Sequence, residues 1–261
     1  MPLSEVQTII LLVVDMSILI PAYNESLRIG ATLTALAAHF RDRAPGVEII
    51  VVDDGSVDGT ADAVRTFAGR RQGPLTIRTI SIPHQGKGAA VAAGVMEARG
   101  KWILMTDADL STPIAEWGKL EAALRDGARV AVGSRQAPGA IIERRQPWVR
   151  QRLGLMFGRL VRALFQTGVY DSQCGFKAFE AEAARELFRD IRARGYCFDV
   201  EVLLRARSLG YRVMEVPVKW RDDPESRVRV LRDWPLILRE LYVIRREIRE
   251  TGRCGGRPGK R

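Results

Sequence analysis

Short apolar runs alternate with longer amphipathic stretches over the first half of the chain. The apolar runs are typical of buried β-strands, and they lie at Ile18–Pro21, Val47–Val52, Leu75–Ser81, Trp102–Met105 and Val130–Gly133. The stretches between them predict helices at Ser26–Phe40, Asp58–Arg70 and Ala89–Ala98. Strands that alternate with helices favour an α/β fold with a mostly parallel sheet.

The second half of the chain is dominated by two amphipathic patterns with helical spacing, Trp148–Phe165 and Trp234–Ile248. In the first, an apolar stripe faces away from three arginines; it contains Val149, Leu153, Met156, Leu160 and Leu164. In the second, the stripe contains Ile237, Leu241, Ile244 and Ile248. Each helix either packs on the domain or lies flat at a membrane surface, with its apolar stripe dipping beneath the headgroups.

The formal net charge of +10 is confined to two segments. Residues 143–162 contain six arginines and one glutamate, and residues 221–261 contain twelve basic and seven acidic residues, so each segment carries +5. Nucleic acid, anionic lipid and diphosphate ligands all fit such a charge. Because the aromatic interleaving of a nucleic-acid stacking platform is missing, we favour an anionic membrane surface and expect no nucleic-acid partner.

The three cysteines have no CxxC spacing and an odd number, which argues against a disulfide framework and favours a reducing compartment. Val6–Val14 is apolar, but it lacks a basic leader and is shorter than the roughly 20 residues that a membrane span needs. We therefore expect an N-terminal extension over residues 1–15, with Met16 as an alternative start. The Gly- and Arg-rich residues 251–261 are expected to be a disordered basic tail.

Polar loops follow four of the predicted strands, where the carboxyl ends of parallel strands collect ligands. These loops are Pro21–Glu25, Asp53–Ser56, Thr106–Leu110 and Ser134–Arg135. In the third loop, Asp107 and Asp109 are two residues apart in an extended segment, so both carboxylates face one point. Two carboxylates, with phosphate oxygens and water, suit Mg²⁺ or Mn²⁺. A solvated turn is the alternative for an isolated Asp-x-Asp.

The other loops offer partners for a nucleotide. One carboxylate of Asp53-Asp54 is placed to bind a base or a ribose, while Ser56 or Asp58 caps the next helix. His84–Gly88 lacks the spacing of an NTPase phosphate loop, but its glycines permit a close approach of a ligand and Lys87 offers a charge. The Arg135 guanidinium has the geometry to clamp a diphosphate. No GxGxxG follows the first strand, which disfavours a dehydrogenase.

Six strings in order resemble the family 2 inverting glycosyltransferases. They are PAYNE (21–25), DDGS (53–56), HQGKG (84–88), DADL (107–110), GSR (133–135) and CGFKAF (174–179). Within the family, the chain looks like the polyprenyl-phosphate and dolichyl-phosphate hexosyltransferases. The strings QCGFK (173–177), FDVE (198–201) and VPVKW (216–220) look more like the glucose branch than the mannose branch. The resemblance covers residues 17–229.

The resemblance implies a GT-A, Rossmann-like domain over residues 16–229, including a basic amphipathic helix within 143–170, followed by a C-terminal amphipathic helix over 230–250. It implies that the nucleoside is held by Pro21, Ala22, Tyr23, Glu25, Asp53 and Asp54. It implies that the diphosphate and the metal are handled by Lys87, Asp107, Ala108, Asp109 and Arg135, of which Asp107, Asp109 and Arg135 are the catalytic residues. It assigns the acceptor phosphate to Arg150, Arg221 and Arg227, with Arg152 an equally close candidate for the first.

The implied reaction is inverting transfer of a hexose from a nucleoside diphosphate sugar to a polyprenyl phosphate at the cytoplasmic face of a membrane. Glucose and UDP-glucose are favoured; GDP-mannose is the alternative donor, and a non-catalytic nucleotide-sugar-binding module is the alternative class. Ser111 stands where mannose synthases often have a glutamine metal ligand, so the choice between Mg²⁺ and Mn²⁺ stays open, as does the oligomeric state. Neither His39 nor His84 lies where a general base is expected.

Overall fold

A seven-stranded mixed sheet forms the centre of the computed structural model, which describes residues 14–43, 46–70, 75–223 and 230–251. The strands lie in the order β3-β2-β1-β4-β7-β5-β8, and only β7 runs antiparallel to its neighbours. Their bounds are β1 Met16–Ala22, β2 Val47–Asp53, β3 Thr76–Ser81, β4 Trp102–Met105, β5 Val130–Ser134, β7 Lys177–Glu180 and β8 Val213–Pro217. The predicted mostly parallel α/β sheet is therefore confirmed.

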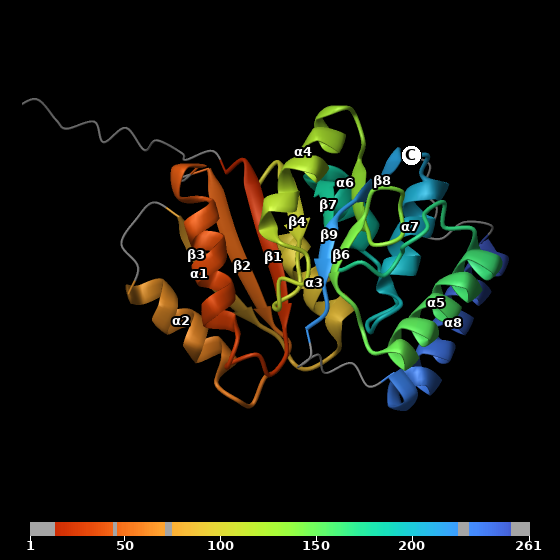
Figure 1. The fold of residues 1–261 in the computed structure, drawn as a ribbon, viewed down its shortest axis with the longest axis horizontal. Coiled ribbons are helices and arrows are strands. Elements are labelled where there is room, and N and C mark those ends of the chain that lie inside the picture. The colour runs from red at the N-terminus through yellow and green to blue at the C-terminus, as the bar shows by residue number, and fades with distance from the viewer. Residues whose placement is uncertain (1–13, 44–45, 71–74, 224–229, 252–261) are drawn as a thin grey trace, which may run out of the picture.

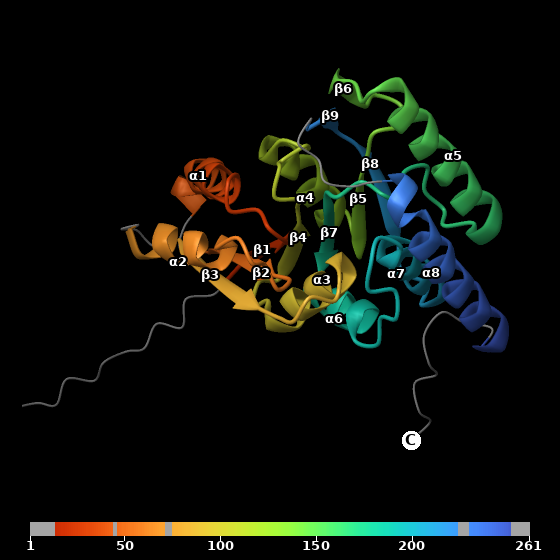
Figure 2. The same cartoon turned by 90° about the horizontal axis from the view of Figure 1, so that it is seen from below.

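Helices cover both faces of this sheet (Figure 2). One face carries α1 Ile29–His39, α2 Thr60–Arg70 and α4 Trp117–Arg125; the other carries α3 Lys87–Glu97, α6 Ala181–Phe188 and α7 Phe198–Ser208. In β1, Ile18 and Ile20 pack toward α1, whereas Leu19 packs toward α3. Because β1, β2, β4 and β5 are buried on both faces, they read as largely apolar runs whose ends were predictable.

All three helices predicted in the first half of the chain begin at residues other than those expected, and the second begins at Thr60, two residues after the predicted Asp58. The first helix begins at Ile29 because the preceding residues form a turn, in which the backbone N–H of Ser26 donates to the Asp58 side chain. The third begins at Lys87, two residues before the predicted Ala89. Lys87 therefore lies in the first turn of α3.

Two long helices, α5 Trp148–Phe165 and α8 Val230–Thr251, lie side by side at one end of the molecule (Figure 1). Of the two alternatives for the apolar stripe of α8, packing on the domain holds where the structure describes the stripe, because Ile237, Leu241 and Ile244 are buried in the core. On α5 the buried side is formed by Val161 and Phe165. Within the described residues, no helix combines the length and apolarity that a membrane crossing requires.

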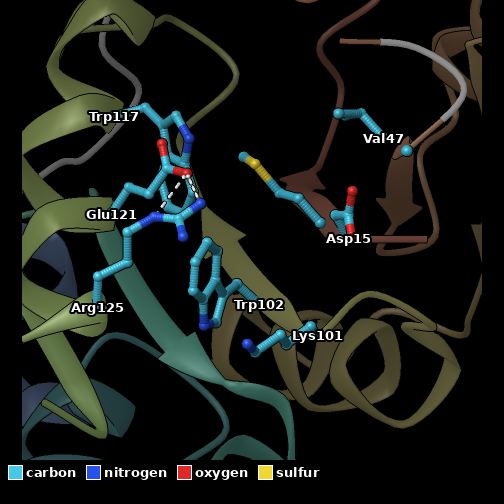
Figure 3. Close-up of a pocket in the computed structure, with 9 residues that line it drawn as sticks. Asp15, Val47, Lys101, Trp102, Trp117, Glu121 and Arg125 are labelled. Carbon is cyan, nitrogen blue, oxygen red and sulfur yellow. Dashed lines mark hydrogen bonds and ion pairs between the residues drawn. The ribbon is translucent and has the colours of Figure 1, made fainter. Parts of the chain in front are cut away.

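A pocket of about 480 Å³ opens at the amino edge of the sheet (Figure 3). Met16, Val47 and Trp102, the first residues of three strands, form its floor. The indole of Trp102 is covered by two cations, with Lys101 Nζ 5.1 Å and the Arg125 guanidinium carbon 4.6 Å from the ring centre. This pocket therefore lies at the edge opposite to the predicted functional loops.

Candidate functional site

The four predicted loops meet at the carboxyl edge of the sheet. The strands β1, β2, β4 and β5 all run in one direction, because the single antiparallel strand β7 separates β4 from β5. A small parallel sheet, β6 Ile141–Arg144 and β9 Lys219–Arg221, lies beside these loops. Strand direction alone thus brings acidic and basic loops to one edge.

Asp107 and Asp109 lie together at the end of β4. The Lys87 ammonium lies 2.5 Å from Asp107 Oδ1, and Asp109 Oδ1 accepts the backbone N–H of Ser111. Burial, and then the charge of Asp107, raise the pKa of Asp109 above its usual value. A carboxylate that its neighbour destabilises in this way is suited to bind a cation.

The residues present fit a divalent ion. Mg²⁺ and Mn²⁺ bind carboxylate oxygens, and Asp107 already accepts a cation, the Lys87 ammonium. Groups of three or more acidic, histidine or cysteine ligands are absent from the described residues. Asp107 and Asp109 would hold such an ion, with phosphate oxygens and water completing its coordination.

Gly175 packs directly against the Asp107 carboxylate. A Cβ atom at Gly175 would lie 1.9 Å from Asp107 Oδ2 and 2.8 Å from Oδ1. Any side chain at this position would therefore displace the Asp107 carboxylate. The glycine of the CGFKAF string is required by close packing against the predicted metal ligand.

A buried ion pair that was not predicted as a functional feature lies beneath the acidic loop. Lys177 begins β7 and Asp199 lies in the first turn of α7; Lys177 Nζ is 2.7 Å from Asp199 Oδ1. The same ammonium donates to the Cys174 carbonyl at 2.5 Å. The available signal was a lysine and an aspartate inside otherwise apolar strings, CGFKAF and CFDV, since both residue types are buried chiefly when paired.

Arg135 is held by Asp171 in a bidentate pair, which the sequence did not predict. Its Nε and Nη2 donate to the two carboxylate oxygens at 2.7 and 2.8 Å, and its guanidinium lies 5.5 Å from the Trp220 ring centre. Burial acts to raise the pKa of Asp171, but Arg135 outweighs it and the pKa is lowered. The clamp of Arg135 on a diphosphate stays a prediction, because both nitrogens of this fork are bound to a carboxylate here.

We expect Asp171→Asn to lower the free energy of unfolding by about 3 kcal/mol at neutral pH, because it leaves Arg135 without its counter-charge. Since folding lowers the pKa of Asp171, the pair stabilises the fold above the unfolded pKa of about 4 and loses this effect as the pH falls through the folded value. Denaturant unfolding of the wild type and the variant from about pH 3 to about pH 7 measures both the loss of stability at neutral pH and its dependence on pH. An unchanged pH dependence in the variant would contradict the pairing.

The predicted nucleoside residues line the ends of β1 and β2. The Tyr23 ring stacks on His84, with 4.1 Å between centroids and a 20° interplanar angle. Glu25 pairs with Arg28 at 2.6 Å, and Asp53 Oδ1 accepts the Ser56 N–H. Pro21 and Ala22 are the last residues of β1.

Asp54 braces the neighbouring loop. Its oxygens accept the N–H groups of Gln85 and Gly86, both at 2.8 Å, and Oδ2 lies 2.9 Å from His84 Nδ1. Nucleoside binding by Asp54 stays a prediction. The capping alternative holds for Asp58, which accepts the Thr60 N–H at the start of α2.

The glycines of HQGKG differ in role from the prediction. They were expected to let a ligand approach, but the chain itself occupies the space. A Cβ at Gly86 would lie 2.6 Å from the Arg194 carbonyl oxygen, and one at Gly88 would lie 2.7 Å from the Phe198 Cβ. These contacts fix the start of α3 against the start of α7.

One pocket of about 460 Å³ joins the acidic loop to Arg221, a predicted acceptor residue. Asp109, Arg144 and Arg221 all line it, and the Arg221 N–H donates to the Ser111 carbonyl at 2.9 Å. Ala108 lines it as well, and its carbonyl accepts the hydroxyl of Thr32. The structure thus places Arg221 in the same pocket as Asp109, one of the two predicted metal ligands.

Two of the other predicted acceptor residues fall outside what the structure describes. The Arg150 side chain and all of Arg227 lie outside the described residues. Arg152 is exposed, and its guanidinium lies 5.7 Å from the Trp148 ring centre. Of the predicted acceptor residues, Arg221 is therefore the one that the described structure brings to the site.

Comparison with known proteins gives one family. The sequence model described as Glycosyl transferase family 2 matches residues 17–188. A dolichyl-phosphate beta-glucosyltransferase of Trichomonas vaginalis is 41% identical over 223 residues, which is 81% of this chain and 65% of that protein. The human dolichyl-phosphate beta-glucosyltransferase is 32% identical over 243 residues, 88% of this chain and 75% of that protein.

Solved structures share the fold at low identity. Glucosyl-3-phosphoglycerate synthase from Mycobacterium tuberculosis, in complex with Mn²⁺ and UDP-glucose, superposes with a TM-score of 0.65 at 19% identity, covering 88% of this chain and 78% of that chain. Mannosyl-3-phosphoglycerate synthase from Rubrobacter xylanophilus gives 0.66 at 21%, covering 95% and 79%. These similarities confirm the predicted GT-A-like α/β fold.

Proposed function

The chain belongs to glycosyl transferase family 2, and from this membership we propose that it transfers a hexose, with inversion, from a nucleoside diphosphate sugar to a polyprenyl or dolichyl phosphate. Glucose and UDP-glucose are the favoured sugar and donor. The observation that carries the proposal is that Asp109 and Arg221 line one pocket. An acidic metal site for the donor diphosphate and a cation for the acceptor phosphate are thereby adjacent.

The names of the curated relatives support glucose and dolichyl phosphate. The mycobacterial synthase, which holds Mn²⁺ and UDP-glucose, supports a donor complex of this composition for the fold. The chain spans 65% of the length of the Trichomonas relative. The activity of the longer proteins is therefore proposed for this chain on the evidence of its own site.

The reaction requires the protein to bring two anions together, the donor diphosphate and the acceptor phosphate. Asp107 and Asp109 would hold a divalent ion, which supplies positive charge to the departing diphosphate. Lys87 adds an ammonium at the same place, 2.5 Å from Asp107. Arg221 and Arg144 line the same pocket as Asp109 and would hold the acceptor phosphate, neutralising its charge as it approaches the sugar.

A phosphate acceptor needs no general base. A phosphate monoester has a second pKa near 6 and is largely dianionic at neutral pH, so its oxygen attacks without losing a proton to the protein. Of the two histidines, His84 stacks on Tyr23 and faces Asp54, and His39 is exposed at the end of α1. The site thus fits a phosphate acceptor better than a sugar hydroxyl.

A donor-by-acceptor assay tests this function. The full chain is incubated with Mn²⁺ or Mg²⁺, with radiolabelled UDP-glucose or GDP-mannose, and with polyprenyl phosphate or a soluble phosphate ester. We expect labelled glucosyl lipid from UDP-glucose only. Transfer from GDP-mannose would show that the donor is GDP-mannose and not UDP-glucose. Transfer to the soluble ester would show that the acceptor is not a lipid phosphate. Donor binding without turnover would indicate a non-catalytic module.

We expect Arg221→Ala to raise the apparent KM for polyprenyl phosphate by about tenfold while the donor KM changes little, because one charge-assisted contact to phosphate is lost. Lys219→Ala is the matched control, since Lys219 lies on the same strand but outside the pocket. Steady-state kinetics with each substrate varied provides the comparison. An unchanged lipid KM in the Arg221 variant would remove its acceptor role.

We also propose that the enzyme attaches peripherally to the anionic cytoplasmic face of a membrane through the outer faces of α5 and α8. Trp148 is 71% exposed on α5 and Tyr242 is 67% exposed on α8. Arginines alternate with these and other exposed apolar residues; they are Arg152, Arg159, Arg239, Arg245 and Arg246. Exposed tryptophan, tyrosine and arginine on one pair of helices suit an anionic lipid surface.

Replacing Trp148 and Met156 together by serine is expected to weaken binding to vesicles that contain anionic lipid by about tenfold, because two exposed apolar side chains are lost from the proposed surface. Met96→Ser is the control, since Met96 is exposed on α3, away from the two helices. Vesicle sedimentation measures the binding. Equal binding by the double variant and the control would reject this surface.

A further inference from the structure

The Lys177–Asp199 pair is buried without a part in the reaction proposed above. Lys177 is 1% exposed and Asp199 is 4% exposed. A buried ion pair is seldom more stabilising than well-packed apolar residues of similar volume, because both ions lose their hydration. Its position beneath the acidic loop therefore calls for a functional explanation.

The negative charges of both Asp107 and Asp199 act on the Lys87 ammonium. Burial acts to lower the pKa of Lys87, but the charges of Asp107 and Asp199 outweigh it, so that the pKa is raised well above its usual value. The close contact of Gly88 with Phe198, next to Asp199, brings the start of α3 onto the start of α7. Positive and negative groups therefore alternate from Lys177 through Asp199 and Lys87 to Asp107.

The Lys87 ammonium and the divalent ion require the same carboxylate. In the structure the ammonium lies 2.5 Å from Asp107 Oδ1, one of the oxygens that a metal ion would bind. An ion bound by Asp107 repels the ammonium and deprives it of its counter-charge. A lysine that is largely buried then needs a second carboxylate. The contact of Gly88 with Phe198 brings Asp199, whose carboxylate Lys177 holds in place, next to Lys87.

We propose that Asp199, fixed by Lys177, is a positioning residue that retains the Lys87 ammonium at the site when a divalent ion takes over Asp107. Lys87 then faces the donor diphosphate together with the ion, and neither competes with the other for Asp107. The inference rests on the proposed function, because it assumes the metal site at Asp107 and Asp109. It gives a role to Asp199 and Lys177, neither of which touches the substrate.

The test is Mn²⁺ binding to the full chain in the absence of donor, followed by electron paramagnetic resonance of free Mn²⁺. Asp199→Asn is expected to weaken Mn²⁺ binding by about tenfold, because Lys87 then has Asp107 as its remaining partner. Lys87→Met is expected to strengthen binding, because it removes the competitor. In the Lys87→Met background, Asp199→Asn is expected to change the affinity by less than about twofold.

Two further variants separate this role from a structural one. Glu48→Gln removes another buried carboxylate, which contacts Ser17 and Arg78 in the region of the amino edge, and is expected to leave Mn²⁺ affinity unchanged. The double variant Lys177→Met with Asp199→Asn leaves no buried lysine unpaired at position 177, so it keeps the test valid if Asp199→Asn alone unfolds. It is expected to show the same tenfold loss, about 1.4 kcal/mol.

The outcomes distinguish the inference from the proposed function. Mn²⁺ affinity that Asp199→Asn leaves unchanged, or an equal loss with and without Lys87, would overturn the role of Asp199 while the metal site stands. Absence of Mn²⁺ binding by the wild-type chain, both alone and with UDP-glucose, would overturn the metal site and the inference together.

Discussion

Asp109→Asn is expected to reduce glycosyl transfer by about three orders of magnitude while the protein remains folded. The charge that would bind the divalent ion is lost, but the amide oxygen keeps the geometry needed to accept the Ser111 N–H. Because burial and Asp107 raise the pKa of Asp109, its ionised form is unfavourable in the folded state. We therefore expect the melting temperature of the variant to equal or exceed that of the wild type.

Transfer rate and melting temperature are measured together on the same preparation. Asp62→Asn is the control, because Asp62 is an exposed carboxylate in α2, paired with Arg65 away from the site. Full activity in the Asp109 variant would discard the metal assignment. A variant that is inactive because it unfolds would contradict the inferred electrostatic cost of Asp109.

Gly175→Ala is expected to reduce transfer by about 100-fold, although it adds only one methyl group. The new Cβ would lie 1.9 Å from Asp107 Oδ2, so the carboxylate must move by more than an ångström or the loop must shift. A displacement of that size at a catalytic group misaligns the reacting atoms. The transfer rate and the Mn²⁺ affinity are expected to fall together, because both depend on Asp107.

Gly118→Ala is the matched control. A Cβ at Gly118 has no heavy atom within 4 Å, and the residue lies inside α4, where alanine favours the helix by up to about 1 kcal/mol. This variant is expected to keep full activity and a slightly higher melting temperature. If Gly175→Ala retained wild-type activity, the support of Asp107 by the CGFKAF loop would be wrong.

The sheet and the edge that carries the candidate site were predictable because their signals are local. A continuous apolar run is enough to identify a strand buried on both faces, and the polar residues after β1, β2, β4 and β5 identify its carboxyl end. The convergence of Asp107, Lys87 and the Asp53–Asp54 loop then follows from strand direction. The single antiparallel strand, β7, did not disturb this, because it leaves β5 parallel to β4.

The helix faces were harder to predict because a helical wheel locates an apolar stripe but not the direction in which it packs. The α8 stripe at Ile237 and Leu241 is core, and the exposed face of the same helix carries Tyr242 among its arginines. A helix with apolar residues on both faces satisfies either interpretation. Tertiary packing decides between them.

The charge partners of the site could not be read from spacing. Asp171 binds Arg135 across 36 positions in the sequence, and Asp199 on helix α7 binds Lys177 on strand β7. Such pairs form because burial makes an unpaired charge costly, and the fold determines which opposite charge is in reach. The roles of the glycines in HQGKG and CGFKAF are likewise determined by neighbours distant in sequence.

The most direct test of this account is a crystal structure of the protein soaked with Mn²⁺ and UDP-glucose, with anomalous scattering used to locate the ion. We expect one Mn²⁺ peak in contact with the carboxylates of both Asp107 and Asp109, bridging them to the donor diphosphate. A peak elsewhere, or a nucleotide bound away from these two residues, would contradict the claim that Asp107 and Asp109 hold the metal ion at the donor diphosphate.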